Sequence, residues 1–372
     1  MALSTIQNNS FADTAVHGYR NLIINGAMQV AQRGTSAALT SGNFTLDRFK
    51  TQSALLDDLA GTMTQDSDAP SGFGNSLKIT TTTAEASIAA DEYFYVSQFI
   101  EAQNLQQLGF GGSSANSITL SFWVKSSQTG VFGISLYTPD NAGIANSTYT
   151  INAVSTWEYK TLTFTGDTSR AINNDTGIGM YVNFHLAAGT NLNSDPTDGN
   201  FEAYSDAKWA GGHVQNGVIT TTSATWQITG VQLEVGSEAT PFEHRPYADE
   251  LRRCQRYFSV PVDNVNEDGA SNTVSAIGVG RGAASGLTVV WALHCPVPMR
   301  DRPALATSGE YWITDSNSRT LGTPSTAVID QFSVDSTILL ANYGFGSVVC
   351  DDDRVNMVGA RTAVRITLDA EL

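Results

Sequence analysis

Residues 117–125, Ser117-Ile-Thr-Leu-Ser-Phe-Trp-Val-Lys125, show the strand pattern that decides the fold. Apolar and polar side chains alternate along this stretch, which is typical of a β-strand with one buried face. The side chains that we expect to face the core are Ile118, Leu120, Phe122 and Val124. Trp123 and Lys125 are expected on the opposite face. The stretch therefore predicts one strand of a sheet that packs on a core.

Further stretches of the same kind lie on both sides of it. They are residues 76–81, 93–100, 131–137, 157–164, 177–185 and 226–236. Turn signals separate them, and Gly230 falls inside the last one, where a glycine suggests a β-bulge. About eight to ten short strands without a helical pattern predict a β-sandwich. No repeat at a fixed period is present, which disfavours a β-helix.

One segment, Pro241-Phe-Glu-His-Arg-Pro-Tyr-Ala-Asp-Glu-Leu-Arg-Arg-Cys-Gln-Arg-Tyr-Phe258, indicates an amphipathic helix instead. Pro246 fits the first helical position, and Asp249 and Glu250 follow in the first turn, where the helix dipole favours negative charge. The apolar stripe at helical spacing consists of Tyr247, Leu251, Cys254 and Phe258. Two interpretations are open, a docked connector helix and a helix at an interface between subunits or domains.

This segment separates two groups of strand patterns and so divides the chain into domains. We expect an all-β chain with an N-terminal arm at 1–19, a large β-sandwich at 20–245, a linker helix at 246–258 and a smaller β-sandwich at 259–372. Apolar side chains in the arm would let it dock onto a neighbouring molecule.

The charge balance limits the partners. The 372 residues include 20 basic and 36 acidic side chains, a formal net charge of −16. A chain this acidic is not expected to have the basic surface that binds nucleic acid or an anionic membrane. No apolar run approaches the ~20 residues of a membrane span, and no secretory signal begins the sequence. We therefore expect a soluble protein with no nucleic-acid partner and no membrane insertion.

Metal and disulfide sites are not predicted. Cys254, Cys295 and Cys350 are odd in number and widely spaced, which disfavours a disulfide framework or a zinc site and favours folding in a reducing cytoplasm. The acidic stretches 195–200 and 351–353 offer oxygen atoms to calcium but lack the spacing of an EF-hand loop, and we interpret them as turns. We expect no bound metal and no cofactor.

Common catalytic motifs are also missing. The sequence has no Gly-x-Ser-x-Gly elbow, no P-loop and no dinucleotide-binding glycine fingerprint. A glycosidase needs two carboxylates roughly 5–10 Å apart, and a sequence does not show which of many acids converge. We expect a non-enzymatic protein without catalytic residues, and glycan cleavage stays open as an alternative.

Aromatic residues are the candidates for ligand binding, because a ring face stacks on the C–H face of a sugar. The candidate sugar platforms are Trp123, Tyr311, Trp312 and Tyr343. The alternative is that these rings pack between sheets or subunits. The remaining tryptophans, assigned to packing, are Trp157, Trp209, Trp226 and Trp291.

Several motifs together resemble those of bacteriophage tail fibres, or virion fibre proteins, with a jelly roll like that of carbohydrate-binding modules. They are Asn21-Leu-Ile-Ile-Asn-Gly-Ala-Met-Gln29, residues 118–126, residues 228–243 and the helical segment that follows, Cys295-Pro-Val-Pro-Met-Arg-Asp-Arg-Pro-Ala304, and the terminal Asp369-Ala-Glu-Leu372. Each motif is weak alone, but their order is more specific and covers the chain from about residue 20 onward. The pattern departs at Thr229-Gly230, where related glycan-binding jelly rolls carry an acidic pair for calcium.

The resemblance implies a jelly roll at 20–245, a tip domain at 259–372 and a homotrimer in the virion tail, assembled in the host cytoplasm. It also implies adhesion to host cell-surface polysaccharide as a receptor-binding protein, with other tail or baseplate proteins bound by the arm. Two alternatives remain, a capsid decoration or head-fibre protein and a glycan-degrading enzyme of the tailspike type.

Overall fold

The computed structural model describes residues 19–54, 56, 58–264, 275–282, 288–308, 311–314, 319–322, 326–331, 338–344, 355–360 and 364–372. The chain divides into two compact units, Met1–Glu250 with Leu372 (unit 1) and Leu251–Glu371 (unit 2). This division falls inside the segment predicted as a linker. The predicted arm lies outside the described residues except for Tyr19.

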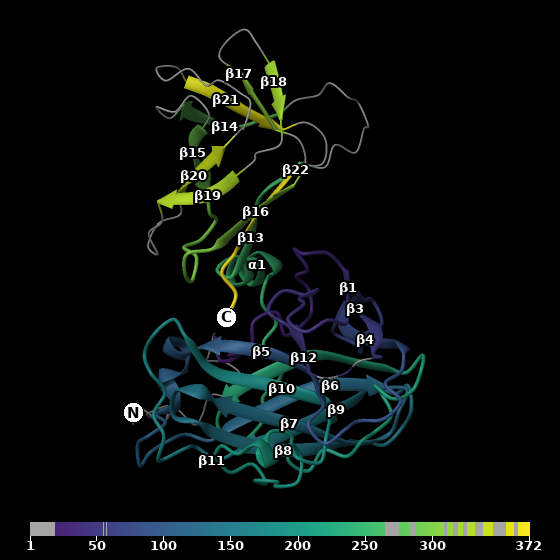
Figure 1. Cartoon of the computed structure of the whole chain (residues 1–372). Coiled ribbons are helices and arrows are strands. Elements are labelled where there is room, and N and C mark those ends of the chain that lie inside the picture. Colours follow the sequence, from purple (N-terminus) through teal and green to yellow (C-terminus); the bar gives the residue numbers. More distant parts are fainter. Residues whose placement is uncertain are drawn as a thin grey trace, which may run out of the picture. The chain divides into compact units, whose positions relative to one another are not determined.

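Unit 1 contains two six-stranded antiparallel sheets, and Figure 1 labels all of their strands except β2. Sheet A has the order β1-β3-β4-β12-β6-β9, with bounds Ser36–Ala38, Ala60–Asp66, Ser76–Thr83, Thr225–Val235, Ile118–Ser126 and Glu158–Phe164. Sheet B has the order β11-β8-β7-β10-β5-β2, with bounds Glu202–Ala203, Gly143–Ile151, Gly130–Thr138, Ile178–Ala188, Tyr93–Glu101 and Lys50–Ala54. Short 3₁₀ helices occupy Ala102–Leu108, Pro139–Asn141 and Asp206–Lys208.

The two sheets of unit 1 enclose one apolar core. The predicted core face of β6, Ile118, Leu120, Phe122 and Val124, is fully buried. The ring centroid of Phe122 lies 5.2 Å from that of Phe184 on β10, and Phe184 lies 6.0 Å from Trp226 on β12. Rings from both sheets therefore interdigitate, as in a sandwich. The predicted all-β, jelly-roll sandwich is confirmed.

A β-bulge interrupts β12 at Gly230, as the sequence suggests. Its φ is +62°, and the register between β12 and β6 shifts between Thr229 and Gln232. A Cβ at Gly230 would lie 2.6 Å from the ring of Phe73, so glycine is needed for both the dihedral angle and the space. The hydroxyl of buried Thr229 donates to the carbonyl of Asn75 at 2.7 Å. Both residues thus hold the segment around Phe73 against sheet A.

Unit 2 consists of antiparallel strands in two sheets. The smaller has the order β13-β22-β16, with bounds Phe258–Asn264, Val364–Asp369 and Ala304–Ser308. The larger has the order β18-β17-β21-β14-β15-β20-β19, with bounds Arg319–Gly322, Tyr311–Thr314, Val355–Ala360, Ser275–Gly282, Thr288–His294, Ile338–Gly344 and Thr326–Gln331. The smaller β-domain after the helix therefore forms as predicted.

Helix α1 spans Tyr247–Gln255 and begins beside Pro246. The N–H groups of Asp249 and Glu250 donate to the Pro246 carbonyl at 3.0 and 3.1 Å. Glu250 is buried, and its carboxylate accepts the backbone N–H of Asn25 at 2.6 Å. The start of the helix therefore agrees with the predicted proline and first-turn acids.

The end of α1 corrects the predicted segment 246–258. The N–H of Tyr257 donates to the carbonyl of Cys254 at 2.9 Å in a turn, and Phe258 begins β13 opposite Asp369. Phe258 lies at helical spacing from Tyr247 in the sequence, but it is the first residue of strand β13. The two side chains also differ in burial, since Phe258 is 5% exposed and Tyr247 is 55% exposed. Phe258 therefore does not belong to a helical stripe. An interface role for Tyr247, Leu251, Cys254 and Phe258 stays a prediction.

Candidate functional site

The four predicted sugar platforms do not form one cluster. Tyr311 and Trp312 lie on β17 and Tyr343 lies on β20, with β21, β14 and β15 between these strands. At about 4.8 Å per strand, that separation is roughly 19 Å across the sheet. Trp123 belongs to unit 1, where its ring centroid lies 5.3 Å from that of Tyr159 on the outer face of sheet A.

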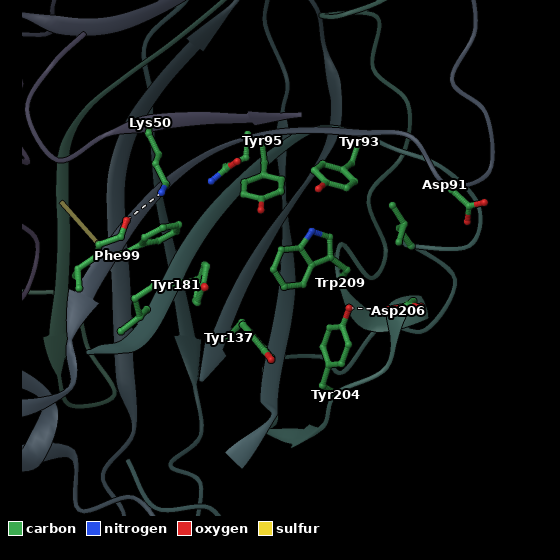
Figure 2. Close-up of a pocket in the computed structure, with 14 residues that line it drawn as sticks. Lys50, Asp91, Tyr93, Tyr95, Phe99, Tyr137, Tyr181, Tyr204, Asp206 and Trp209 are labelled. Carbon is green, nitrogen blue, oxygen red and sulfur yellow. Dashed lines mark hydrogen bonds between the residues drawn. The ribbon is translucent and has the colours of Figure 1, made fainter. Parts of the chain in front are cut away.

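The outer face of sheet B carries a groove that the sequence reasoning missed. Its volume is about 760 Å³, within the usual range for ligand sites. The seven aromatic side chains that line it are Tyr93, Tyr95, Phe99, Tyr137, Tyr181, Tyr204 and Trp209. Figure 2 shows these rings around a central hollow, with Lys50 at one side and Asp91 and Asp206 at the other.

Strand alternation places most of these rings. On β5, Phe94 and Val96 are fully buried in the core, so Tyr95 and its neighbours two residues away point outward. The register sets Tyr181 of β10 between Phe99 of β5 and Tyr137 of β7. Centroids are 4.2 Å apart for Phe99 and Tyr181 and 5.4 Å apart for Tyr137 and Tyr181. Three neighbouring strands therefore present a continuous aromatic surface.

The insertion between β10 and β12 builds the facing wall. Trp209 contributes its ring, with centroid distances of 5.6 Å to Tyr95, 5.5 Å to Tyr137 and 6.0 Å to Tyr204. Trp209 is half-buried, so its assignment to packing alone is incomplete. Its ring both packs on sheet B and lines the groove.

A close backbone approach holds this insertion on β7. The N–H of Gly133 donates to Nδ1 of His213 at 3.1 Å. A Cβ at Gly133 would lie 3.0 Å from the Cβ of His213 and 3.3 Å from the carbonyl oxygen of Ala210. Burial lowers the pKa of His213 to about 4, so the ring is neutral near pH 7 and Nδ1 accepts this hydrogen bond. The position of Trp209 thus depends on a glycine and a neutral histidine.

Buried polar side chains on the same face form a hydrogen-bonded chain across β5, β10 and β7. Ser97 Oγ donates to Asn183 Oδ1 at 2.7 Å, and Asn183 Nδ2 donates to Ser135 Oγ at 3.1 Å. Ser135 Oγ and His185 Nε2 are 2.9 Å apart. Burial lowers the pKa of His185 well below its usual value, and neighbouring His213 lowers it further. A hydrogen-bonded network of this kind makes an uncharged floor.

The tyrosine hydroxyls of the groove are available to a ligand. Within the described part of the chain, the hydroxyls of Tyr93, Tyr95, Tyr137 and Tyr181 have no hydrogen-bond partner. Tyr95 is only 6% exposed, but its hydroxyl oxygen itself reaches the open space of the groove. Burial, together with neighbouring Tyr93, raises the pKa of Tyr95 far above its usual value, so its hydroxyl stays protonated. The groove therefore offers several neutral donors.

The candidate metal ligands and cysteines lie apart in the described part of the chain. The described residues contain no cluster of three or more His, Cys, Asp or Glu side chains that could hold a metal. Cys254 and Cys295 are buried and not joined in a disulfide, while Cys350 and residues 351–353 lie outside the described part. Asp195 of the other acidic stretch pairs with Lys208. No helix in the described ranges is long and apolar enough to cross a membrane.

Comparisons with known proteins give no family. No family model matches the sequence, and no curated protein matches it. Among solved structures, an enzymatically active domain of tailspike protein 4 of bacteriophage CBA120 matches at 14% identity and TM-score 0.33, covering 58% of this chain and 22% of that one. The family 11 carbohydrate-binding module of Clostridium thermocellum, in complex with a β-1,3-1,4-mixed-linked tetrasaccharide, matches at 13% identity and TM-score 0.28, covering 55% and 99%. These likenesses are too distant to carry an argument about function.

Proposed function

We propose that unit 1 binds carbohydrate in the groove on sheet B. The observation that carries this proposal is the lining itself, seven aromatic rings around a hollow into which unpartnered tyrosine hydroxyls project. Ring faces stack on the C–H faces of pyranoses, and hydroxyl groups that both donate and accept match the hydroxyls of a sugar. The rings stand on neighbouring strands, which gives the preorganisation that a binding site needs.

We further propose that this binding serves adhesion by a non-enzymatic fibre protein of a virion tail that recognises host cell-surface polysaccharide. Support for this step comes from the sequence motifs that resemble phage fibre proteins, and the homotrimer rests on the same resemblance. Weak sites repeated on a trimer and again around a tail would gain avidity without strong single contacts.

A direct test compares two tryptophans on opposite outer faces of unit 1. Isothermal titration calorimetry with glycans selected on an array should show binding to the full chain. Trp209→Ala should lower the affinity at least about tenfold, because a stacked aromatic contact and the groove wall are lost together. Trp123→Ala should leave the affinity unchanged. Loss of binding in Trp123→Ala alone would place the site on sheet A and refute the groove.

Two further assays address the alternatives for the biological role. Incubation with host polysaccharide should release no new reducing ends, and their appearance would favour the glycan-degrading alternative. Electron microscopy of virions labelled against this chain should place the label on the tail. Label on the head would favour the capsid decoration or head-fibre alternative.

A further inference from the structure

The groove on sheet B is asymmetric in charge. Lys50 lies at one side, and the carboxylates of Asp91 and Asp206 lie at the other (Figure 2). Asp91 accepts a hydrogen bond from Asn191 Nδ2 at 2.8 Å, and Asp206 accepts one from the hydroxyl of Tyr204 at 2.7 Å. Within the described residues, neither carboxylate forms an ion pair, and both are exposed. The acidic side of the groove therefore has two carboxylates that form no ion pair with any basic side chain in the described ranges.

The aromatic rings of the groove also favour a cation over an anion. An aromatic face attracts a cation within about 6 Å of its centroid, and tryptophan does so best. Lys50 already shows this contact inside the groove, with Nζ 3.9 Å from the centroid of Phe99 and 5.6 Å from that of Phe44. Trp209 lies toward the acidic side of the hollow, near Asp206 (Figure 2). A cation at that side would face an indole ring and carboxylates, whereas an anion would face like charges.

A second observation indicates that this space receives a polar ligand. Tyr95 is 94% buried, its hydroxyl has no partner among the described residues, and Figure 2 shows the hydroxyl directed into the hollow next to Trp209. A phenolic oxygen accepts hydrogen bonds as well as donating one. It therefore suits a ligand group rich in N–H donors, and the polar side chains of the floor bond to one another rather than to this hydroxyl.

We propose that the acidic side of the groove takes a sugar unit that carries an ammonium group, that is, an amino sugar without an N-acetyl group. The inference rests on the carbohydrate-binding function proposed above and names the class of sugar. Asp91 and Asp206 supply the opposite charge, Trp209 stacks on the pyranose, and the Tyr95 hydroxyl accepts a hydrogen bond. The net charge of −16 further favours a cationic over an anionic glycan at low salt.

The test uses matched monosaccharides and the full chain. Methyl glycosides of glucosamine, N-acetylglucosamine, glucose and glucuronic acid, and the same set in the galacto series, are titrated by NMR at about pH 6 and low ionic strength. We expect the ammonium-bearing glycoside to bind about 5- to 10-fold more tightly than the neutral one, and the glucuronide most weakly. The preference should decrease in about 0.5 M salt, where surface charges are screened.

Charge variants separate this inference from the function on which it rests. Asp206→Asn and Asp91→Asn should lower the ratio of the affinity for the ammonium glycoside to that for the neutral glycoside from about 5–10 toward one. Asp198→Asn is the matched control, since Asp198 is exposed on the same insertion outside the groove and its φ of +52° suits asparagine. Equal binding of neutral and ammonium glycosides would overturn the inference and leave carbohydrate binding intact. Absence of binding to any glycoside or longer glycan would overturn both.

Discussion

Replacement of His213 by asparagine should make the free energy of unfolding depend less on pH between about pH 6.5 and pH 4. In the folded protein the pKa of His213 is lowered from 6.5 to about 4 because the ring is buried. The unfolded chain therefore binds more protons than the folded chain between these two pH values. By linkage, the stabilisation is fully present above about pH 6.5 and is lost as the pH falls toward 4.

The size of the effect follows from the shift. One pKa unit corresponds to 1.36 kcal/mol, so the lowered pKa of His213 should cost about 2 kcal/mol at pH 5 and about 3 kcal/mol at pH 4 relative to pH 7.5. Asparagine places its side-chain oxygen close to the position of Nδ1, so His213→Asn keeps an acceptor for the Gly133 N–H but does not titrate in this range. His185 remains in both proteins, and the loss of neighbouring His213 removes one cause that lowers its pKa, so its contribution changes in the same direction.

The assay is urea unfolding of the full chain and of His213→Asn at pH 7.5, 5 and 4, followed by tryptophan fluorescence. All six tryptophans contribute to this signal, so unfolding of unit 1 is confirmed by hydrogen exchange of its strands. The expected result is a difference between the two proteins that increases by about 2 kcal/mol from pH 7.5 to pH 5. Parallel pH profiles would show that His213 is solvated or charged in the folded state, which would refute the proposed tie between β7 and the insertion.

Three other substitutions test the groove and the core. Phe122→Ala should lower the free energy of unfolding by about 3–5 kcal/mol in urea titrations, because it leaves a cavity between the sheets of unit 1; a loss below about 1 kcal/mol would contradict the sandwich packing. Gly133→Ala should weaken glycan binding in calorimetry severalfold at about 1–3 kcal/mol cost in stability, since the new methyl group pushes His213 and the Trp209 wall away; unchanged binding would show that the wall is dispensable. Tyr95→Phe should reduce glycan affinity up to about tenfold without lowering the unfolding temperature, because the lost hydroxyl has no partner among the residues that the structure describes. A lower unfolding temperature would reveal a structural hydrogen bond instead.

The core of unit 1 was predictable because period-two alternation determines which side chains face inward. Residues 118–124 show this most clearly, since the predicted core positions Ile118, Leu120, Phe122 and Val124 are all fully buried. The bulge at Gly230 was also predictable, because a glycine inside a strand often marks a bulge. Glycine adopts the positive φ and has no Cβ to clash with Phe73. Phe258 shows the limit, since one residue at helical spacing does not distinguish the last turn of a helix from the first residue of a strand.

The groove was not predictable, for two physical reasons. Strand β5 carries aromatic residues on both faces, so alternation gives no preference between Phe94 as core and Tyr95 as site. Trp209 lies in an insertion without periodicity, and its partners Tyr95 and Tyr137 come from distant strands that only the sheet order brings together. The available signal was compositional, a tyrosine-rich strand together with a tryptophan in a long polar insertion.

The two outer faces of unit 1 differ in a way that favours the proposed ligand site on sheet B. On sheet A, the ring of Phe73 lies over Gly230 and packs against Phe242 at 5.1 Å, so a chain segment covers the surface beside half-buried Trp123. On sheet B, the insertion stands at the side and places Trp209 opposite the strand tyrosines, which leaves a walled hollow rather than a covered surface. On a sheet face that a chain segment covers, the polar groups form hydrogen bonds within the protein. On a face with the segment at its side, the polar groups stay open to a ligand. The tyrosine hydroxyls without a partner among the described residues are therefore what this architecture predicts for a binding face, whereas a sugar-binding role for Trp123 on sheet A stays a prediction.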